Sequence, residues 1–309
     1  MGLLTTIREH RRTVASVSTV SVFSTALVGM ALLYEGEATA DVDLNDSGVW
    51  VTKTSAGLVG RFNYESQAMD GTLNAGSASF DVQQDAGRVL LDDQGTSTSS
   101  PVDVAHLKLT GQIRLPAGAQ VASGGATTAI LDGEEGLLWV LPFDGATSFD
   151  AEKLDPTAEV GGDGALTVSE DGTVFVAVPS TGALWTVETT SKGAVSGDPA
   201  STSLPVGKGA EVEVTAVGDE PVVLDRSASQ LVLPGGRTVA VEGAEQARLQ
   251  QPSAGSGDVV VATTDALVTQ PLKGGDAQRR AAQGVPAAPV RLGSCTYGAW
   301  ASTGQVIRD

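Results

Sequence analysis

The sequence predicts an all-β fold, a β-propeller-like domain of about seven blades that follows a single N-terminal transmembrane helix. The composition is the first reason: 38 glycines and only 4% aromatic residues favour many short strands with tight turns. The second is a series of short β-branched runs separated by Gly, Asp and Ser turns, without a sustained helical period after Tyr34. The third is the regular spacing of these runs along the chain.

The spacing is measured between apolar positions that we take as equivalent inner-strand positions of successive hairpins. They are Trp50, Leu90, Trp139, Phe175, Val223, Val260 and Trp300. The gaps run from 36 to 49 residues and average about 42. One four-stranded blade per period of this length is typical of a β-propeller. Tandem β-sandwiches, with a turn every 8–12 residues or so, are the alternative fold.

Seven strand–turn–strand segments carry these positions, and each fits a β-hairpin. They are 47–53 with 58–62, 79–83 with 88–91, 129–131 with 136–141, 171–178 with 183–187, 221–224 with 230–233, 258–262 with 266–269, and 295–300 with 305–308. Three Gly-, Ser- or Pro-rich stretches between hairpins, 94–101, 251–257 and 274–289, are expected to be surface loops.

The N-terminal region is expected to anchor the chain in a membrane. Residues 13–34 are uncharged, and a helix of this length spans the ~30 Å hydrocarbon core of a bilayer. Arg8, Arg11 and Arg12 precede it, which places the N-terminus in the cytoplasm. We therefore expect a cytoplasmic region at 1–12, a transmembrane signal-anchor at 13–34, an acidic stalk at 35–46 and an extracellular domain at 47–309.

The alternative for the same region is a cleaved signal peptide. Ala38-Thr39-Ala40 fits a small-x-small cleavage site, so that a secreted chain would begin at Asp41. The apolar stretch is longer than a signal peptide needs, whereas its four serines and three threonines weaken it as an anchor. Both interpretations place the remainder outside the cytoplasm.

Charge and cysteine content limit the partners. The net charge is −18, and an acidic surface of this size repels nucleic acid phosphates, so no nucleic acid partner is expected.

Cys295 is the only cysteine, and outside the cytoplasm a disulfide is the usual fate of a thiol. Three fates are open: Cys295 pairs with another chain, stays a free thiol, or pairs with a residue beyond Asp309. We favour the last, because Gln305–Arg308 has the pattern of the beginning of a second hairpin strand, and a domain rarely ends within a hairpin.

The two ends of the chain resemble a known family. The sequence from Glu35-Gly-Glu-Ala to Val49-Trp-Val-Thr52, then Gly57-Leu-Val-Gly-Arg-Phe-Asn63, and the C-terminal Cys295-Thr-Tyr-Gly-Ala-Trp300 are similar to the start of large actinobacterial membrane-anchored envelope proteins. The resemblance implies a propeller-like extracellular region with fibronectin type III or immunoglobulin-like repeats downstream, and a cysteine partner just past Asp309. It implies no catalytic residues.

Few residues could carry metal or nucleophilic chemistry. His106 is the only histidine after the N-terminal region and is expected to be incidental in an apolar strand, so zinc, copper and haem chemistry are excluded. Calcium needs only oxygen ligands. Asp41, Asp43 and Asn45 match the first half of a calcium loop, but Asp46 and Thr52 stand where Gly and Glu are required. This is a weak calcium candidate, and no other cofactor is expected.

Paired carboxylates are the remaining chemistry, because glycoside hydrolysis needs only two of them. Four acidic pairs lie in or beside predicted turns and are expected to be solvated surface. They are Asp92 with Asp93, Glu134 with Glu135, Glu211 with Glu213, and Asp219 with Glu220. We expect a non-enzymatic scaffolding, adhesion or ligand-binding module of a larger surface protein, with envelope polysaccharide or protein as partner. A carboxylate-based, polysaccharide-acting protein is the alternative.

Overall fold

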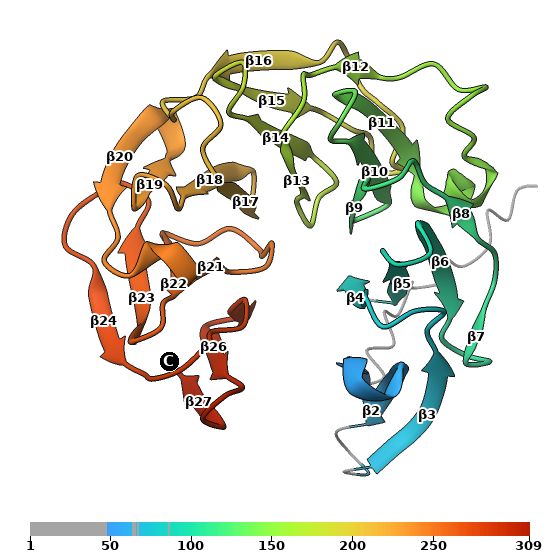
Figure 1. Ribbon diagram of the computed structural model, residues 1–309, viewed down its shortest axis with the longest axis horizontal. Helices are drawn as coiled ribbons and strands as arrows, with labels where there is room; N and C mark the ends of the chain where they lie inside the picture. Colours follow the sequence, from blue (N-terminus) through green and yellow to red (C-terminus); the bar gives the residue numbers. More distant parts are fainter. Residues whose placement is uncertain (1–47, 64–65, 67, 86) are drawn as a thin grey trace, which may run out of the picture. The chain divides into compact units, whose positions relative to one another are not determined.

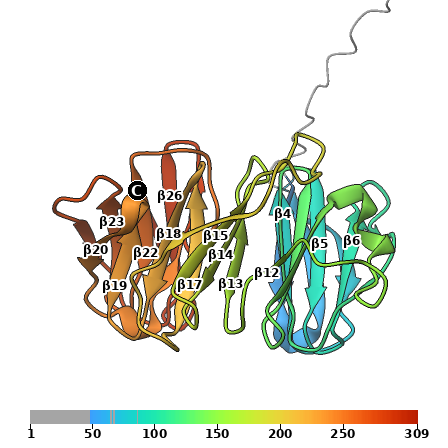
Figure 2. The same cartoon turned by 90° about the horizontal axis from the view of Figure 1, so that it is seen from above.

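The computed structural model describes residues 48–63, 66, 68–85 and 87–309. The described residues belong to one compact unit of the chain. In this unit seven antiparallel sheets surround a common centre, as Figure 1 shows. Figure 2 shows the strands of neighbouring sheets running side by side. The fold is a seven-bladed β-propeller, which confirms the predicted class and excludes tandem sandwiches.

The blades are numbered in chain order. The first blade contains β1 (Gly48–Lys53), β2 (Leu58–Asn63) and β3 (Ala68–Asn74). The second blade contains β4 (Phe80–Asp85), β5 (Arg88–Asp93), β6 (Thr98–Asp103), β7 (Lys108–Leu109) and β8 (Ile113–Arg114). The third blade contains β9 (Gln120–Gly124), β10 (Thr127–Asp132), β11 (Leu137–Pro142) and β12 (Ala158–Glu159), and the fourth contains β13 (Ala165–Val168), β14 (Val174–Val178), β15 (Ala183–Val187) and β16 (Ala200–Ser203).

The remaining three blades continue in the same order. The fifth contains β17 (Val212–Val217), β18 (Glu220–Asp225), β19 (Gln230–Leu233) and β20 (Arg237–Ala240); the sixth β21 (Arg248–Leu249), β22 (Asp258–Ala262), β23 (Ala266–Pro271) and β24 (Gln278–Ala281); the seventh β25 (Val290–Leu292), β26 (Cys295–Trp300) and β27 (Gln305–Arg308). Four short 3-10 helices connect strands: η1 (Thr54–Ala56), η2 (Phe143–Ser148), η3 (Pro234–Gly236) and η4 (Ala244–Gln246).

The described residues include no helix long and apolar enough to cross a membrane. The predicted segments 1–12, 13–34 and 35–46 lie outside the described residues, so the structure does not test them.

All seven predicted hairpins are present, but the positions used to measure the period are not equivalent. Trp50 lies on the first strand of its blade and Trp139 on the third, whereas the other five lie on second strands. Trp139 is paired in register with Ile130 on the second strand, so the two residues share a face and the apolar pattern does not distinguish them. Two predicted loops also contain strands, β6 and β24.

The core consists of six apolar clusters, each between two consecutive blades. The first and second blades share the cluster around Trp50 and Val89, and the sixth and seventh share the one around Val260 and Trp300. The other four join the second to third, third to fourth, fourth to fifth, and fifth to sixth blades. Each blade is therefore stabilised by burial against its neighbours in the chain.

Glutamine side chains link the innermost strands of adjacent blades through hydrogen bonds. Gln83 Nε2 donates to the Val121 carbonyl at 2.7 Å, and the Ser123 amide donates back to Gln83 Oε1 at 3.0 Å. Gln120 makes the same pair of bonds, to the carbonyl of Gly164 and the amide of Leu166. Gln84 does so with the carbonyl of Gly48 and the amide of Trp50. In each case one amide satisfies a carbonyl and an N–H two residues apart, as a neighbouring strand would.

Replacing Gln83 with Met tests this role, because Met keeps the length of the side chain and removes both bonds to the backbone as well as the hydrogen bond that Ser123 Oγ donates to Gln83 Oε1. We expect the free energy of unfolding to fall by about 1–2 kcal/mol, since two partly buried backbone groups lose their partner. Urea denaturation of both proteins measures it. Gln278→Met, on the exposed strand β24, is the matched control and should change stability by less than about 0.5 kcal/mol. Equal effects from the two substitutions would contradict the proposed role.

Candidate functional site

The candidate site is a cavity of about 820 Å³ among the innermost strands. Figure 1 shows β4, β9, β13, β17 and β21 nearest the centre of the ring, and residues of all five strands line the cavity. Its lining is rich in ionisable groups: Asp81, Asp85, Asp163, Glu170, Glu211 and Glu213 against Arg226 and Arg248. Six carboxylates therefore face two guanidinium groups.

Both arginines are already paired with cavity carboxylates. Arg226 contacts Glu211 Oε1 through Nη1 at 3.0 Å and Glu213 Oε2 through Nη2 at 2.5 Å. Its Nε donates to the Ala247 carbonyl at 3.1 Å, which ties the fifth blade to the start of the sixth. Arg248 Nε lies 3.5 Å from Glu213 Oε1. The expectation that Glu211 and Glu213 are simply solvated is therefore wrong for Glu213, whose side chain is 21% exposed and paired.

Asp85 and Glu170 are the cavity carboxylates with raised pKa values. Partial burial raises the pKa of Asp85, although the Gly125 amide donates to its Oδ2 at 2.5 Å and Arg88 opposes the shift. Partial burial also raises the pKa of Glu170, and the negative charge of Asp85 adds to the effect. These two side chains come from the second and fourth blades, so the ring brings like charges close enough to interact.

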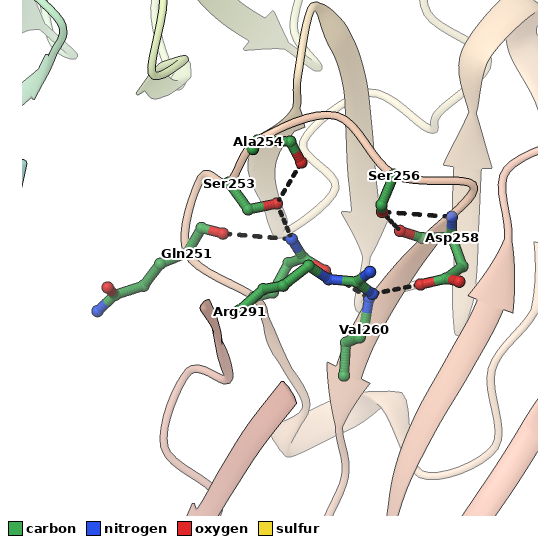
Figure 3. A network of polar contacts seen from close by, with 8 residues as sticks. Gln251, Ser253, Ala254, Ser256, Asp258, Val260 and Arg291 are labelled. Atoms are coloured by element: carbon green, nitrogen blue, oxygen red, sulfur yellow. Dashed lines mark hydrogen bonds and ion pairs between the residues drawn. The ribbon is translucent and has the colours of Figure 1, made fainter. Parts of the chain in front are cut away.

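The wall between the sixth and seventh blades is held by a polar network that Figure 3 shows in close-up. Arg291 Nη2, from β25, forms an ion pair with Asp258 Oδ1, from β22. Gln250 receives a hydrogen bond on Oε1 from the Val260 amide at 2.8 Å and donates through Nε2 to Ser253 Oγ at 2.8 Å. Gln250 and Gln251 line the cavity, so this network fixes part of its wall.

Among the described residues that line the cavity, none is aromatic. Sugar-binding sites favour exposed aromatic side chains, which stack on sugar rings. Trp50, Trp139 and Trp300 are buried, Trp185 is half-buried, and none of the four lines the cavity. The cavity thus combines several carboxylates with a lining of aliphatic, amide and hydroxyl groups.

A smaller cavity of about 400 Å³ lies beside Asp92, between the second and third blades. Asp92 was expected to be solvated, but it is 6% exposed and its Oδ1 is buried without a hydrogen-bond partner. Asp81 lies directly opposite it on β4. Burial, with the negative charge of Asp81 adding to it, raises the pKa of Asp92 to about 6.

Asp93 was also expected to be solvated and is instead a buried structural residue. Its Oδ2 accepts hydrogen bonds from the amides of Gly76 and Ser77 at 2.7 and 2.9 Å, and its Oδ1 accepts one from Ser77 Oγ at 2.5 Å. Burial acts to raise the pKa of Asp93, but these bonds outweigh it and hold the pKa below its usual range. Of the remaining predicted pairs, Glu134 with Glu135 and Asp219 with Glu220 are exposed, as expected.

The other predicted site residues do not reach the cavity. Asp41, Asp43 and Asn45, the calcium candidates, lie outside the described residues. His106 is in an exposed turn, where its Nδ1 lies 2.8 Å from Asp103 Oδ2, so the expected position in an apolar strand is wrong. In the described part of the chain, no cluster of three or more His, Cys, Asp or Glu side chains could hold a metal ion.

Cys295 is at the start of β26 and is a free thiol among the described residues. Arg308 Nη2 lies 3.2 Å from its Sγ, and this hydrogen bond lowers the pKa of the thiol. Pairing of Cys295 with a residue beyond Asp309 stays a prediction.

No family model matches the chain, and no curated protein matches it. Solved structures resemble it in fold. Dihydro-heme d1 dehydrogenase NirN, in complex with DHE, has a TM-score of 0.57 and 12% identity over 86% of this chain and 59% of its own. Apo AztD from Citrobacter koseri has a TM-score of 0.55 and 11% identity, covering 86% and 80%. BamB from Moraxella catarrhalis has a TM-score of 0.54 and 14% identity, covering 84% and 77%. This chain thus spans less than two thirds of NirN, and at these identities the likeness concerns the fold alone.

Replacing Asp92 with Asn tests the burial of this carboxyl. Because the folded-state pKa is about 6 and the unfolded value about 3.9, protonation favours the folded state. The contribution of the protonated Asp92 carboxyl to the free energy of unfolding is therefore fully present below about pH 4 and is lost as the pH rises through about 6. We expect Asp92→Asn to raise the free energy of unfolding at pH 7 by about 1–2 kcal/mol and to change it little at pH 4. Urea denaturation at both values measures this; a pH-independent difference would contradict it.

Proposed function

We propose that this chain is a non-enzymatic propeller module of a larger, envelope-anchored surface protein, and that it binds a ligand in the central cavity. Residues 13–34 hold it in the membrane, and the propeller stands outside the cell. The anchored form retains its N-terminus in the membrane fraction, which N-terminal sequencing of the mature protein detects. A mature chain that begins at Asp41 would contradict anchoring.

The observation that carries the binding role is the unbalanced charge of the cavity. Glu211 and Glu213 are paired with Arg226, and Arg248 lies beside Glu213. Of the other four cavity carboxylates, Asp85 and Glu170 have raised pKa values, and the charge of Asp85 adds to the shift of Glu170. A positive group placed between these carboxylates would relieve their repulsion and lower both pKa values. The ligand that fits this chemistry is a basic segment of an envelope protein partner.

A polysaccharide-acting role is the second candidate, because the cavity does gather carboxylates from different blades. Glu170, with its raised pKa, has the property that a general acid needs. The absence of an aromatic residue from the described cavity lining weakens this candidate. Turnover of a polysaccharide by the full chain that Glu170→Gln abolishes would favour it over the binding role.

Binding of a short oligolysine peptide to the full-length protein in detergent, measured by calorimetry at low salt, tests the cavity. We expect the double variant Asp85→Asn with Glu170→Gln to bind the peptide about tenfold more weakly, because two partly desolvated charge contacts are lost. Glu134→Gln with Glu135→Gln, on an exposed turn away from the cavity, removes the same charge and is the control. Equal weakening by both variants would show general attraction to an acidic protein and contradict a cavity site.

A further inference from the structure

Asp92 differs from the other buried aspartates in its hydrogen bonding. Four aspartates are buried among the described residues, and three of them, Asp93, Asp132 and Asp225, accept hydrogen bonds from backbone amides. Asp92 is 6% exposed, and no described residue donates a hydrogen bond to its Oδ1. A buried polar atom without a partner is costly, so a structural role like that of the other three does not account for Asp92.

The Asp92 side chain points into the smaller cavity. Leu90, two residues before it on β5, packs toward the third blade, and side chains two residues apart on a strand lie on the same face. Asp92 therefore faces the third blade, where it lines the cavity of about 400 Å³. Ser99 is opposite Asp92 on β6, but its hydroxyl donates to the Leu91 carbonyl at 3.4 Å instead.

A second carboxylate lies beside Asp92 in the same cavity. Asp81, on β4, is directly opposite Asp92, which places their Cβ atoms about 4.5–5.5 Å apart on one face of the sheet. Like charges in this position destabilise a sheet. The described residues that line the cavity include no Lys, Arg or His. The lining therefore holds two carboxylates and no cationic side chain to balance them.

We propose that this cavity binds a divalent cation of the calcium class between the carboxylates of Asp81 and Asp92. A divalent cation balances both charges, and it coordinates Asp92 Oδ1 directly where no hydrogen-bond donor is present. Gln94 and Ser97 add amide and hydroxyl oxygens to the lining, which has neither imidazole nor sulfur among its described residues, so the donor set suits a hard cation. Two carboxylates are enough, because water molecules in the cavity complete the oxygen ligands.

The cation site is separate from the ligand site proposed for the central cavity. Asp81, Gln83 and Gln120 line both cavities, so the two adjoin, and a cation can reach the smaller one from the centre. Asp85 and Glu170 line the central cavity alone. Binding of the cation would remove the repulsion between β4 and β5 and so stabilise the second blade.

Calcium chloride added to the metal-free full-length protein in detergent tests the site, by calorimetry and by melting temperature. About pH 8 is suitable, because it is above the pKa of about 6 of Asp92. We expect saturating calcium to raise the melting temperature by about 3 °C or more. Asp92→Asn and Asp81→Asn should each bind calcium at least about tenfold more weakly, since a charged ligand is lost. Asp219→Asn, on an exposed turn of the fifth blade, is the matched control and should bind as the unmodified protein does.

Unfolding does not confound this test, because Asp92→Asn is expected to stabilise the metal-free protein at neutral pH. The double variant Asp85→Asn with Glu170→Gln should retain the calcium response, even if it no longer binds a basic peptide. No calcium response, a response that Asp92→Asn leaves unchanged, or an equal response to sodium chloride at the same ionic strength would each overturn the proposal. A response lost only in the double variant would place the cation in the central cavity and overturn it as well.

Discussion

The packing of one blade on the next is the constraint on which this structure depends. A blade is one sheet with two apolar faces, and neither face can be buried within the blade. In β14 every residue is buried: Val174, Val176 and Val178 pack toward the third blade, and Phe175 and Ala177 toward the fifth. β22 divides its side chains between the fifth and seventh blades in the same way. No blade is therefore stable alone, and its neighbours fix its position.

The packing of the blades also determines which groups line the central cavity. Stacking blades side by side points one edge of each innermost strand at the central cavity, where its N–H and C=O groups have no strand to pair with. Gln83, Gln84 and Gln120 satisfy part of these groups and hold adjacent blades together. Most of the charged groups that line the cavity are carboxylates. Their excess over Arg226 and Arg248 follows from the ring, which gathers acidic side chains far apart in the sequence.

The sequence predicts the hairpins well because two paired strands and their turn are local. Apolar runs such as 174–178 need only their neighbours along the chain to be recognised. β24 was missed because its four residues, Gln278–Ala281, are all exposed and carry no apolar pattern. Asp93 was misjudged because the backbone that buries it, at Gly76 and Ser77, precedes it by 16 or 17 residues. The cavity was beyond prediction for the same reason: Asp85 and Glu170 meet only through the ring.

Backbone hydrogen exchange of the full-length protein, read by mass spectrometry across the blades, tests this dependence most directly. If each blade is buried only by its neighbours, the second strands from β10 to β22 should share one high level of protection, without a break at any blade boundary. Protection that divides into two blocks, each lost independently as denaturant is added, would mean that the chain contains separate cores. That result would contradict a continuous ring.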